Sequence, residues 1–203
     1  MGTRNLTAVF SGGEYKVAQY GQWDGYPSGQ GAKILSFLSD NGNIKNLQSN
    51  LGKVRFLDPQ GVDKDFCESY DKNAPKWSNE PDNRTAEQIR WFVSYISRDI
   101  GGDILSSIAD SKDKEIVIKN SIDFAGDSLF CEWAYVIDFD KGTLEVFRGF
   151  NTDPLERNDR FYGVKTDSDK YHPVKLFHTF QLDNLPKKDE FISILEPDDE
   201  DGE

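Results

Sequence analysis

Two tight-turn signals beside strand-forming segments constrain the fold of this chain more than any other feature. The first, Ser11-Gly12-Gly13, separates the strand candidates Asn5–Phe10 and Glu14–Tyr20, and glycine adopts the positive φ that such turns require. The second, Asp140-Lys141-Gly142, leads into the strand candidate Thr143–Arg148. Strands joined by tight turns are antiparallel, and no strand–helix–strand alternation is present. The sequence therefore predicts a single α+β domain with a largely antiparallel sheet, an N-terminal hairpin and several packed helices.

The remaining elements follow from the spacing of apolar residues. Apolar residues three and four apart indicate helices, and alternation indicates strands. These patterns predict helices at Ala32–Leu38, Asn43–Leu51, Thr85–Ile100, Asp103–Ala109 and Leu185–Leu195, and strands at Glu115–Lys119, Leu129–Asp138 and Pro173–Leu182. Residues 58–84 are polar and irregular, which is typical of a long surface excursion. We expect one domain over residues 1–195 and an acidic, disordered tail over residues 196–203.

The composition excludes several classes of protein. Aromatic residues make up 13% of the 203 residues, which is more than a disordered chain carries. No apolar run approaches about 18 residues, and the first ten residues lack the pattern of a secretory signal, so we expect a cytoplasmic protein with no membrane partner. Two cysteines and two histidines make neither a disulfide framework nor a metal site, and no cofactor motif is complete. Nothing in these patterns indicates an oligomeric state.

The negative charge is concentrated at the end of the chain. The formal net charge is −12, which argues against direct nucleic-acid binding, because duplex binding requires lysine and arginine at the phosphates. Eight acidic and no basic residues follow Lys188, so residues 1–188 carry only −4. An acidic surface for a protein partner therefore depends mainly on the tail Glu196–Glu203, for which a solvated end is the alternative interpretation.

The glycine-rich segment Gly21–Gly31 is the main candidate for a binding site. It places Trp23, Asp24 and Tyr26 among glycines that allow a ligand to approach closely, and Ser28 leads into a helix. Exposed N–H groups at a helix start favour an anion. We therefore predict a small polar or anionic ligand here, with Asp24 as polar anchor or acid–base group and the two rings as stacking walls. The alternative is that Asp24 caps a turn and both rings only cover the hairpin core.

The segment Asp127–Asp138 supplies two further site candidates. Alternation puts Cys131, Trp133 and Tyr135 on one face and Glu132 on the other, beside small apolar residues. Glu132 and Trp133 therefore join the predicted ligand site, and pairing of the glutamate with a base at a sheet edge is the alternative. Cysteine catalysis would need an imidazole beside the thiolate, and the alternative is a small buried core residue.

Four stretches of the chain together resemble a broad, uncharacterised family of bacterial, phage and fungal proteins. They are GTRN at Gly2–Asn5, VAQYGQWDGYPSGQG at Val17–Gly31, FAGDSLFCEWAYVID at Phe124–Asp138 and TLEVFRGFN at Thr143–Asn151. Family members typically open with Gly-Thr-Arg-Gly and carry a Trp/Phe-Asp-x-Tyr-Pro-x-Gly loop. This chain has Asn5 where the family usually has glycine. The resemblance covers most of the chain and supports the loop, but it implies no reaction.

A second resemblance is architectural and leaves open whether the protein is an enzyme. A strand, a tight hairpin, a second strand and an Asp-containing loop are similar to the start of N-terminal-nucleophile amide hydrolases. Those enzymes use a terminal Cys, Ser or Thr whose free amine serves as base, whereas removal of Met1 leaves Gly2 and exposure of Thr3 needs a further cut. Three hypotheses remain: a ligand-binding or enzymatic domain, a protein-interaction or inhibitor module with an acidic surface, and an amide hydrolase using Thr3 or Cys131.

Overall fold

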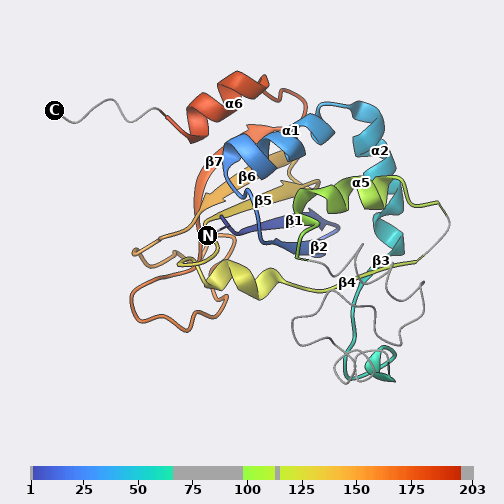
Figure 1. The fold of residues 1–203 in the computed structure, drawn as a ribbon, viewed down its shortest axis with the longest axis horizontal. Helices are drawn as coiled ribbons and strands as arrows, with labels where there is room; N and C mark the ends of the chain where they lie inside the picture. The colour runs from blue at the N-terminus through green and yellow to red at the C-terminus, as the bar shows by residue number, and fades with distance from the viewer. Residues whose placement is uncertain (1, 66–97, 113–114, 198–203) are drawn as a thin grey trace.

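The computed structural model describes residues 2–65, 98–112 and 115–197, drawn in colour in Figure 1. The helices are α1 (Ala32–Leu38), α2 (Asn41–Asn50), α5 (Ile104–Ala109) and α6 (Lys188–Leu195). The strands are β1 (Asn5–Ser11), β2 (Glu14–Gly21), β3 (Val54–Phe56), β4 (Ile116–Ile118), β5 (Trp133–Asp138), β6 (Thr143–Arg148) and β7 (Lys175–Gln181). This is the predicted single α+β domain with an N-terminal hairpin.

A five-stranded sheet in the order β2-β1-β5-β6-β7 forms the centre of the domain. β1 pairs with β2, and β5 with β6, as the antiparallel hairpins that the turn sequences predict. Gly12 and Gly13 have φ of 66° and 81°, the geometry of a two-residue type I′ turn. β1 and β5 pair in parallel, with Asn5 opposite Trp133, so one central pair departs from the otherwise antiparallel sheet. A separate parallel pair joins β3 to β4.

Helices cover one face of the central sheet (Figure 1). On that face β1 contributes Val9 and β5 contributes Tyr135 and Ile137, all fully buried. The helices α1, α2, α5 and α6 bring their own apolar residues into the same cluster, including Ile34, Leu35, Leu38, Leu47, Ile104, Leu105, Ile108, Phe191 and Leu195. Burial of apolar surface in this layer is the main force that holds the helices on the sheet.

Connecting segments cover the opposite face. Small residues of the sheet, such as Ala8 and Ala134, pack there against Phe161 and Val174 from the connection between β6 and β7. A 3₁₀ turn at Ile122–Gly126 completes this layer. Because the sheet residues are small, the covering chain lies close to the strands.

The strand predicted at Leu129–Asp138 begins four residues later than expected. The N–H groups of Phe130 and Cys131 both donate to the Asp127 carbonyl, at 3.0 and 2.7 Å, so a turn occupies the first part of the segment. Cys131 consequently packs with the small residues of the second layer. The prediction that it shares a face with Trp133 and Tyr135 is wrong for this reason.

The alternation predicted for Pro173–Leu182 is interrupted by a bulge in β7. Val146 pairs with His178 and Phe147 pairs with Leu176, which leaves Phe177 as an extra residue. An extra residue reverses the facing of the side chains that follow it. Val174 therefore lies in the second layer, whereas Phe180 packs under the helices.

Four of the predicted helices are present, with ends within three residues of those predicted. Residues 98–100, the described end of the helix predicted at Thr85–Ile100, are not helical, and α6 begins at Lys188 instead of Leu185. α1 has the predicted bounds, and α2 begins at Asn41 because the Asp40 carboxylate accepts the Gly42 N–H at 2.6 Å. Most of the helix predicted at Thr85–Ile100 and of the excursion at residues 58–84 lies outside the described residues. Among the described helices, none combines the length and apolar character needed to cross a membrane.

Candidate functional site

Hydrogen bonds to two strands fix the backbone of the glycine-rich loop. The Gly25 N–H donates to the Thr3 carbonyl at 2.9 Å, and the Gly25 carbonyl accepts the Tyr135 hydroxyl at 2.8 Å. A Cβ at Gly25 would lie 2.8 Å from the Thr3 carbonyl oxygen, so the chain can pass here only as glycine. Burial raises the pKa of Tyr135 well above its ordinary value, which keeps its hydroxyl protonated as a donor.

Asp24 adopts a left-handed backbone conformation, with φ of 53°. Its carbonyl oxygen accepts the Gln30 N–H at 2.7 Å, and a Cβ at Gly29 would lie 2.3 Å from that oxygen. Aspartate tolerates this conformation better than most residues. The loop then enters a π-helical turn, Pro27–Gly31, that continues directly into α1. Turns of this kind occur often at functional sites.

A second segment, Arg98–Asp103, is hydrogen-bonded to the loop. Gln30 is buried, and its side-chain oxygen accepts the Gly102 N–H at 2.9 Å. The Trp23 indole N–H donates to the Asp99 carboxylate at 2.8 Å. These contacts join parts of the chain that lie about 70 residues apart and hold the indole in one position.

The predicted ligand-binding side chains of the loop lie at the surface. Trp23 is 47% exposed and Tyr26 is 41% exposed, and Asp24 and Ser28 are also exposed. The backbone N–H of Ser28, where we predicted an anion, donates to the Glu196 carboxylate at 3.2 Å. The first residue of the predicted tail therefore already supplies a negative group at this point.

Glu132 and Trp133 lie one strand away from the loop. Trp133 is buried under the helical layer, and its register partner Asn5 donates its side-chain N–H to the Trp23 carbonyl at 3.4 Å. Glu132 is half-buried and accepts the Arg4 N–H at 3.4 Å. It precedes a central strand and not an edge strand, and among the described residues its contact is with backbone, so the alternative of pairing with a base at a sheet edge is not found there.

The two candidate nucleophiles are both buried. Cys131 is completely buried, and burial raises the pKa of its thiol well above the usual value, with Asp127 and Glu132 adding to the effect. Its sulfur lies 3.6 Å from the Trp133 carbonyl. Thr3 is 6% exposed. Neither side chain is placed for attack on a substrate in this conformation.

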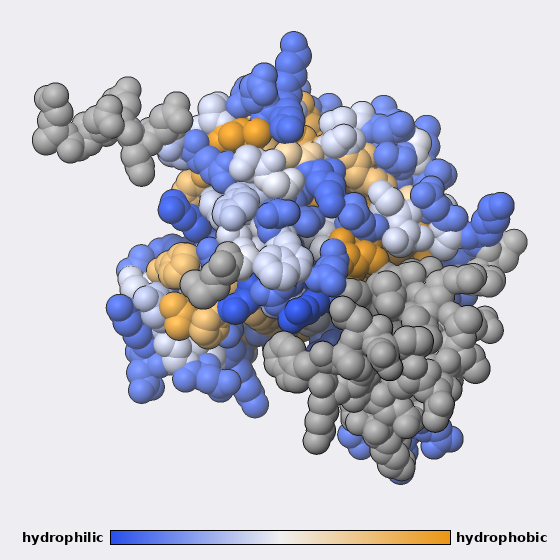
Figure 2. Space-filling view, in the orientation of Figure 1, coloured by the Kyte–Doolittle hydropathy of each residue, from blue (hydrophilic) through white to orange (hydrophobic). Residues whose placement is uncertain are grey.

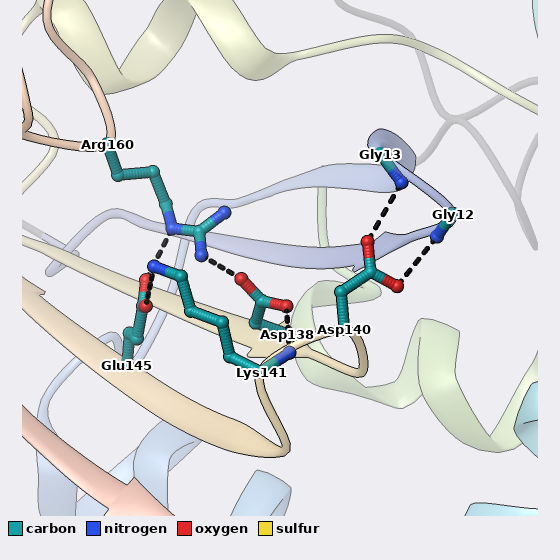
Figure 3. Close-up of polar contacts among 7 residues, drawn as sticks. All are labelled: Gly12, Gly13, Asp138, Asp140, Lys141, Glu145 and Arg160. Atoms are coloured by element: carbon teal, nitrogen blue, oxygen red, sulfur yellow. Dashed lines mark hydrogen bonds and ion pairs between the residues drawn. The ribbon is translucent and has the colours of Figure 1, made fainter.

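The sequence interpretation missed a network of buried charges on the second face of the sheet (Figure 3). Asp138 at the end of β5 is 1% exposed, and Glu145 in β6 is 5% exposed. The guanidinium of Arg160 binds both carboxylates, and the ammonium of Lys141 lies 3.1 Å from Glu145. Burial opposes the charge of Arg160, but its bonds to Glu145, Tyr15 and Asp138 raise its pKa above the ordinary value.

A sequence signal for this network was available. Asp138 continues the inward positions of β5 after Ala134 and Val136, and Glu145 precedes inward Phe147 in β6. Charged residues at inward positions are rare unless they are paired. Asp140, two residues after Asp138, points to the first hairpin, where its carboxylate accepts the N–H groups of Gly12 and Gly13, both at 2.8 Å (Figure 3).

Clefts lined by described residues lie near these elements. One of about 410 Å³ adjoins the charge network and is lined by Tyr15, Glu145 and Arg160 among others. One of about 930 Å³ lies between the 3₁₀ turn and residues 162–168, with Phe130 and Tyr162 in its wall. One of about 580 Å³ lies at the edge of β2. Within the described residues no three His, Cys, Asp or Glu side chains are grouped so that they could hold a metal ion.

Comparison with known proteins adds no relative to this description. No family model matches the chain, and neither the curated proteins nor the solved structures include a match.

Proposed function

We propose that the protein binds a small polar ligand at the Trp23–Gly31 loop. The observation that carries this proposal is the presence of two exposed aromatic side chains, Trp23 and Tyr26, on a backbone that hydrogen bonds fix on both sides. Large aromatic side chains on a rigid frame give contact area at a small entropic cost. Such a loop is preorganised, so little conformational entropy is lost when a ligand binds.

The charges around the loop favour a ligand with N–H donors or a cationic group. Asp24 presents an exposed carboxylate between the two aromatic residues, and aromatic faces attract cations. At the start of the helix, Glu196 already accepts the Ser28 N–H. An anionic ligand would have to displace the Glu196 carboxylate. An amine or amide could instead donate hydrogen bonds to the carboxylates of Asp24 and Glu196.

The exposed surface is consistent with a small ligand. In the view of Figure 2 hydrophilic residues predominate, and apolar residues form separate small patches. Large protein interfaces of the obligate kind are more apolar than this. The view therefore supports a local ligand site on a polar surface.

A thermal-shift screen tests the proposal. Small amines, amides and sugars form one set, and small carboxylates form the other. Compounds that stabilise the wild type are then titrated into Asp24→Asn, which keeps a residue that tolerates positive φ, and into Tyr26→Ala. We expect hits from the first set and a loss of affinity of about tenfold or more in each variant.

Tyr162→Ala is the matched control, because Tyr162 is an equally exposed aromatic residue (52%) that lines a different cleft. It should leave the affinity unchanged. The proposal is wrong if both loop variants bind the hits as tightly as the wild type, or if only carboxylates bind and Glu196→Gln strengthens them at Ser28.

A further inference from the structure

The cleft of about 580 Å³ at the outer edge of β2 is separate from the loop side chains discussed above. One wall is the end of β2, with Gln19 and Tyr20, and another is Arg98. The third is the segment Lys119–Phe124, which follows β4. The Ser121 N–H donates to the Ala18 carbonyl at 2.9 Å, so this segment is fastened to the strand edge and the cleft is a fixed feature of the fold.

Two cationic side chains line this cleft. Arg98 and Lys119 both line it, and no ion pair joins either of them to another residue of the described chain. Asp123 is the acidic residue of the lining. The lining therefore carries an excess of positive charge, although residues 1–188 have a net charge of −4, and this excess favours an anionic occupant.

An aromatic pair forms the apolar part of the wall. The rings of Tyr20 and Phe124 pack edge to face, with centroids 4.8 Å apart and an interplanar angle of 73°. The Tyr20 hydroxyl donates to the Gln22 side-chain oxygen at 2.7 Å, which fixes the ring. Partial burial raises the pKa of Tyr20, so it stays uncharged, although Arg4 and Arg98 act in the opposite direction.

We propose that this cleft binds a small organic anion that carries a planar ring, such as an aromatic carboxylate or phosphate. Arg98 and Lys119 would pair with the anionic group, and the Tyr20–Phe124 pair would pack against the ring. The volume lies within the range of small-molecule sites, about 300–1,000 Å³. This inference does not depend on the Trp23–Gly31 loop, because it uses different side chains and a ligand of opposite charge.

Matched probes separate the contributions of charge and ring. Benzoate carries both features, cyclohexanecarboxylate keeps the charge and lacks the planar ring, and benzylamine keeps the ring and reverses the charge. Adenosine monophosphate tests whether a phosphate replaces the carboxylate. Binding is followed by NMR titration of the whole chain at low salt, because screening weakens such contacts. We expect benzoate to bind several-fold more tightly than cyclohexanecarboxylate, and benzylamine to cause no shifts at the residues of this cleft.

Charge variants at the surface of the cleft test the assignment without disturbing the core. Arg98→Gln and Lys119→Gln should each weaken benzoate binding about fivefold or more, and Asp123→Asn should strengthen it. Lys187→Gln is the control, because Lys187 is an exposed lysine at the start of α6 that does not line the cleft, and it should have no effect. The thermal midpoint of each variant confirms that it is folded.

The titrations of wild type and variants either support or overturn the proposal. Loss of binding in both cleft variants but not in the control supports the proposal, whether or not the loop variants Asp24→Asn and Tyr26→Ala affect any ligand. Absence of saturable binding of benzoate and adenosine monophosphate to the wild type overturns it. Equal binding to wild type, Arg98→Gln and Lys119→Gln overturns it as well.

Discussion

The buried charge network predicts an unequal response to the loss of two cations that share one carboxylate. Glu145 is bound by both Arg160 and Lys141, but the arginine side chain is 10% exposed and the lysine side chain is 63% exposed. Arg160→Met leaves two buried carboxylates, and Asp138 then has no cation within the described chain. Removing one member of a buried ion pair costs about 3–5 kcal/mol, whereas an exposed pair contributes about 0.2–1 kcal/mol.

Urea unfolding at pH 7, followed by circular dichroism, measures both effects. We expect Arg160→Met to lower the free energy of unfolding by about 3–5 kcal/mol and Lys141→Met to lower it by at most about 1 kcal/mol. In a chain of this size each kcal/mol shifts the melting temperature by roughly 2–4 °C. The arginine variant should therefore melt about 6–20 °C below the wild type, and the lysine variant less than about 4 °C below it.

Amide variants of the two carboxylates provide a second readout of the same reasoning. Adding Asp138→Asn and Glu145→Gln to Arg160→Met removes the unpaired negative charges and should recover part of the lost stability at pH 7. Equal losses for Arg160→Met and Lys141→Met, with no recovery in the combined variant, would refute the role given to burial.

Three further predictions concern the turn, the loop and the thiol. Hydrogen bonds from the first hairpin turn lower the pKa of Asp140, so its contribution to stability is present above about pH 4 and lost as the pH falls through the folded value. The difference in melting between wild type and Asp140→Asn should therefore shrink as the pH falls below about 4. Gly31→Ala places a Cβ 3.0 Å from the ring of a buried tyrosine and should cost about 1–3 kcal/mol in urea unfolding, while Gly52→Ala, with open space around it, should be tolerated. In a Cys67→Ser background, Cys131 should react with a thiol reagent only after denaturation, and rapid labelling of the native protein would contradict its burial.

The hairpins and α1 could be predicted because their signals are local. Two glycines with no Cβ fix the first turn, and the apolar spacing of Ala32–Leu38 fixes one face of a helix. The ends of strands were harder to predict from the sequence, because the turn before β5 depends on two N–H groups that share the Asp127 carbonyl. The bulge at Phe177 depends on the register of the neighbouring strand, which a single segment does not encode.

The candidate site was predictable in its location more than in its chemistry. The cluster of glycines around Trp23 and Tyr26 marks a special backbone, and the structure has both rings exposed there. The contact between Ser28 and Glu196 joins residues 168 positions apart, so no local pattern could reveal that an internal carboxylate takes the place of an anion. Asp138 and Glu145 lie at inward strand positions, which is a local signal, but their cation Arg160 comes from a connecting segment, so the pairing itself could not be predicted from the strands.

The parallel pairing of β1 with β5 has a consequence for the order of folding during synthesis. The register partners Asn5 and Trp133 are 128 positions apart, and chain elongation proceeds at about 5–20 residues per second. The hairpin is complete at Gly21, 112 residues before Trp133, so it exists for roughly 6–22 s before its neighbour is made, and throughout that time the inner edge of β1 is open to any other strand. Fragments that end before Trp133 should accordingly associate with one another, and a nascent chain has most need of a chaperone during this interval.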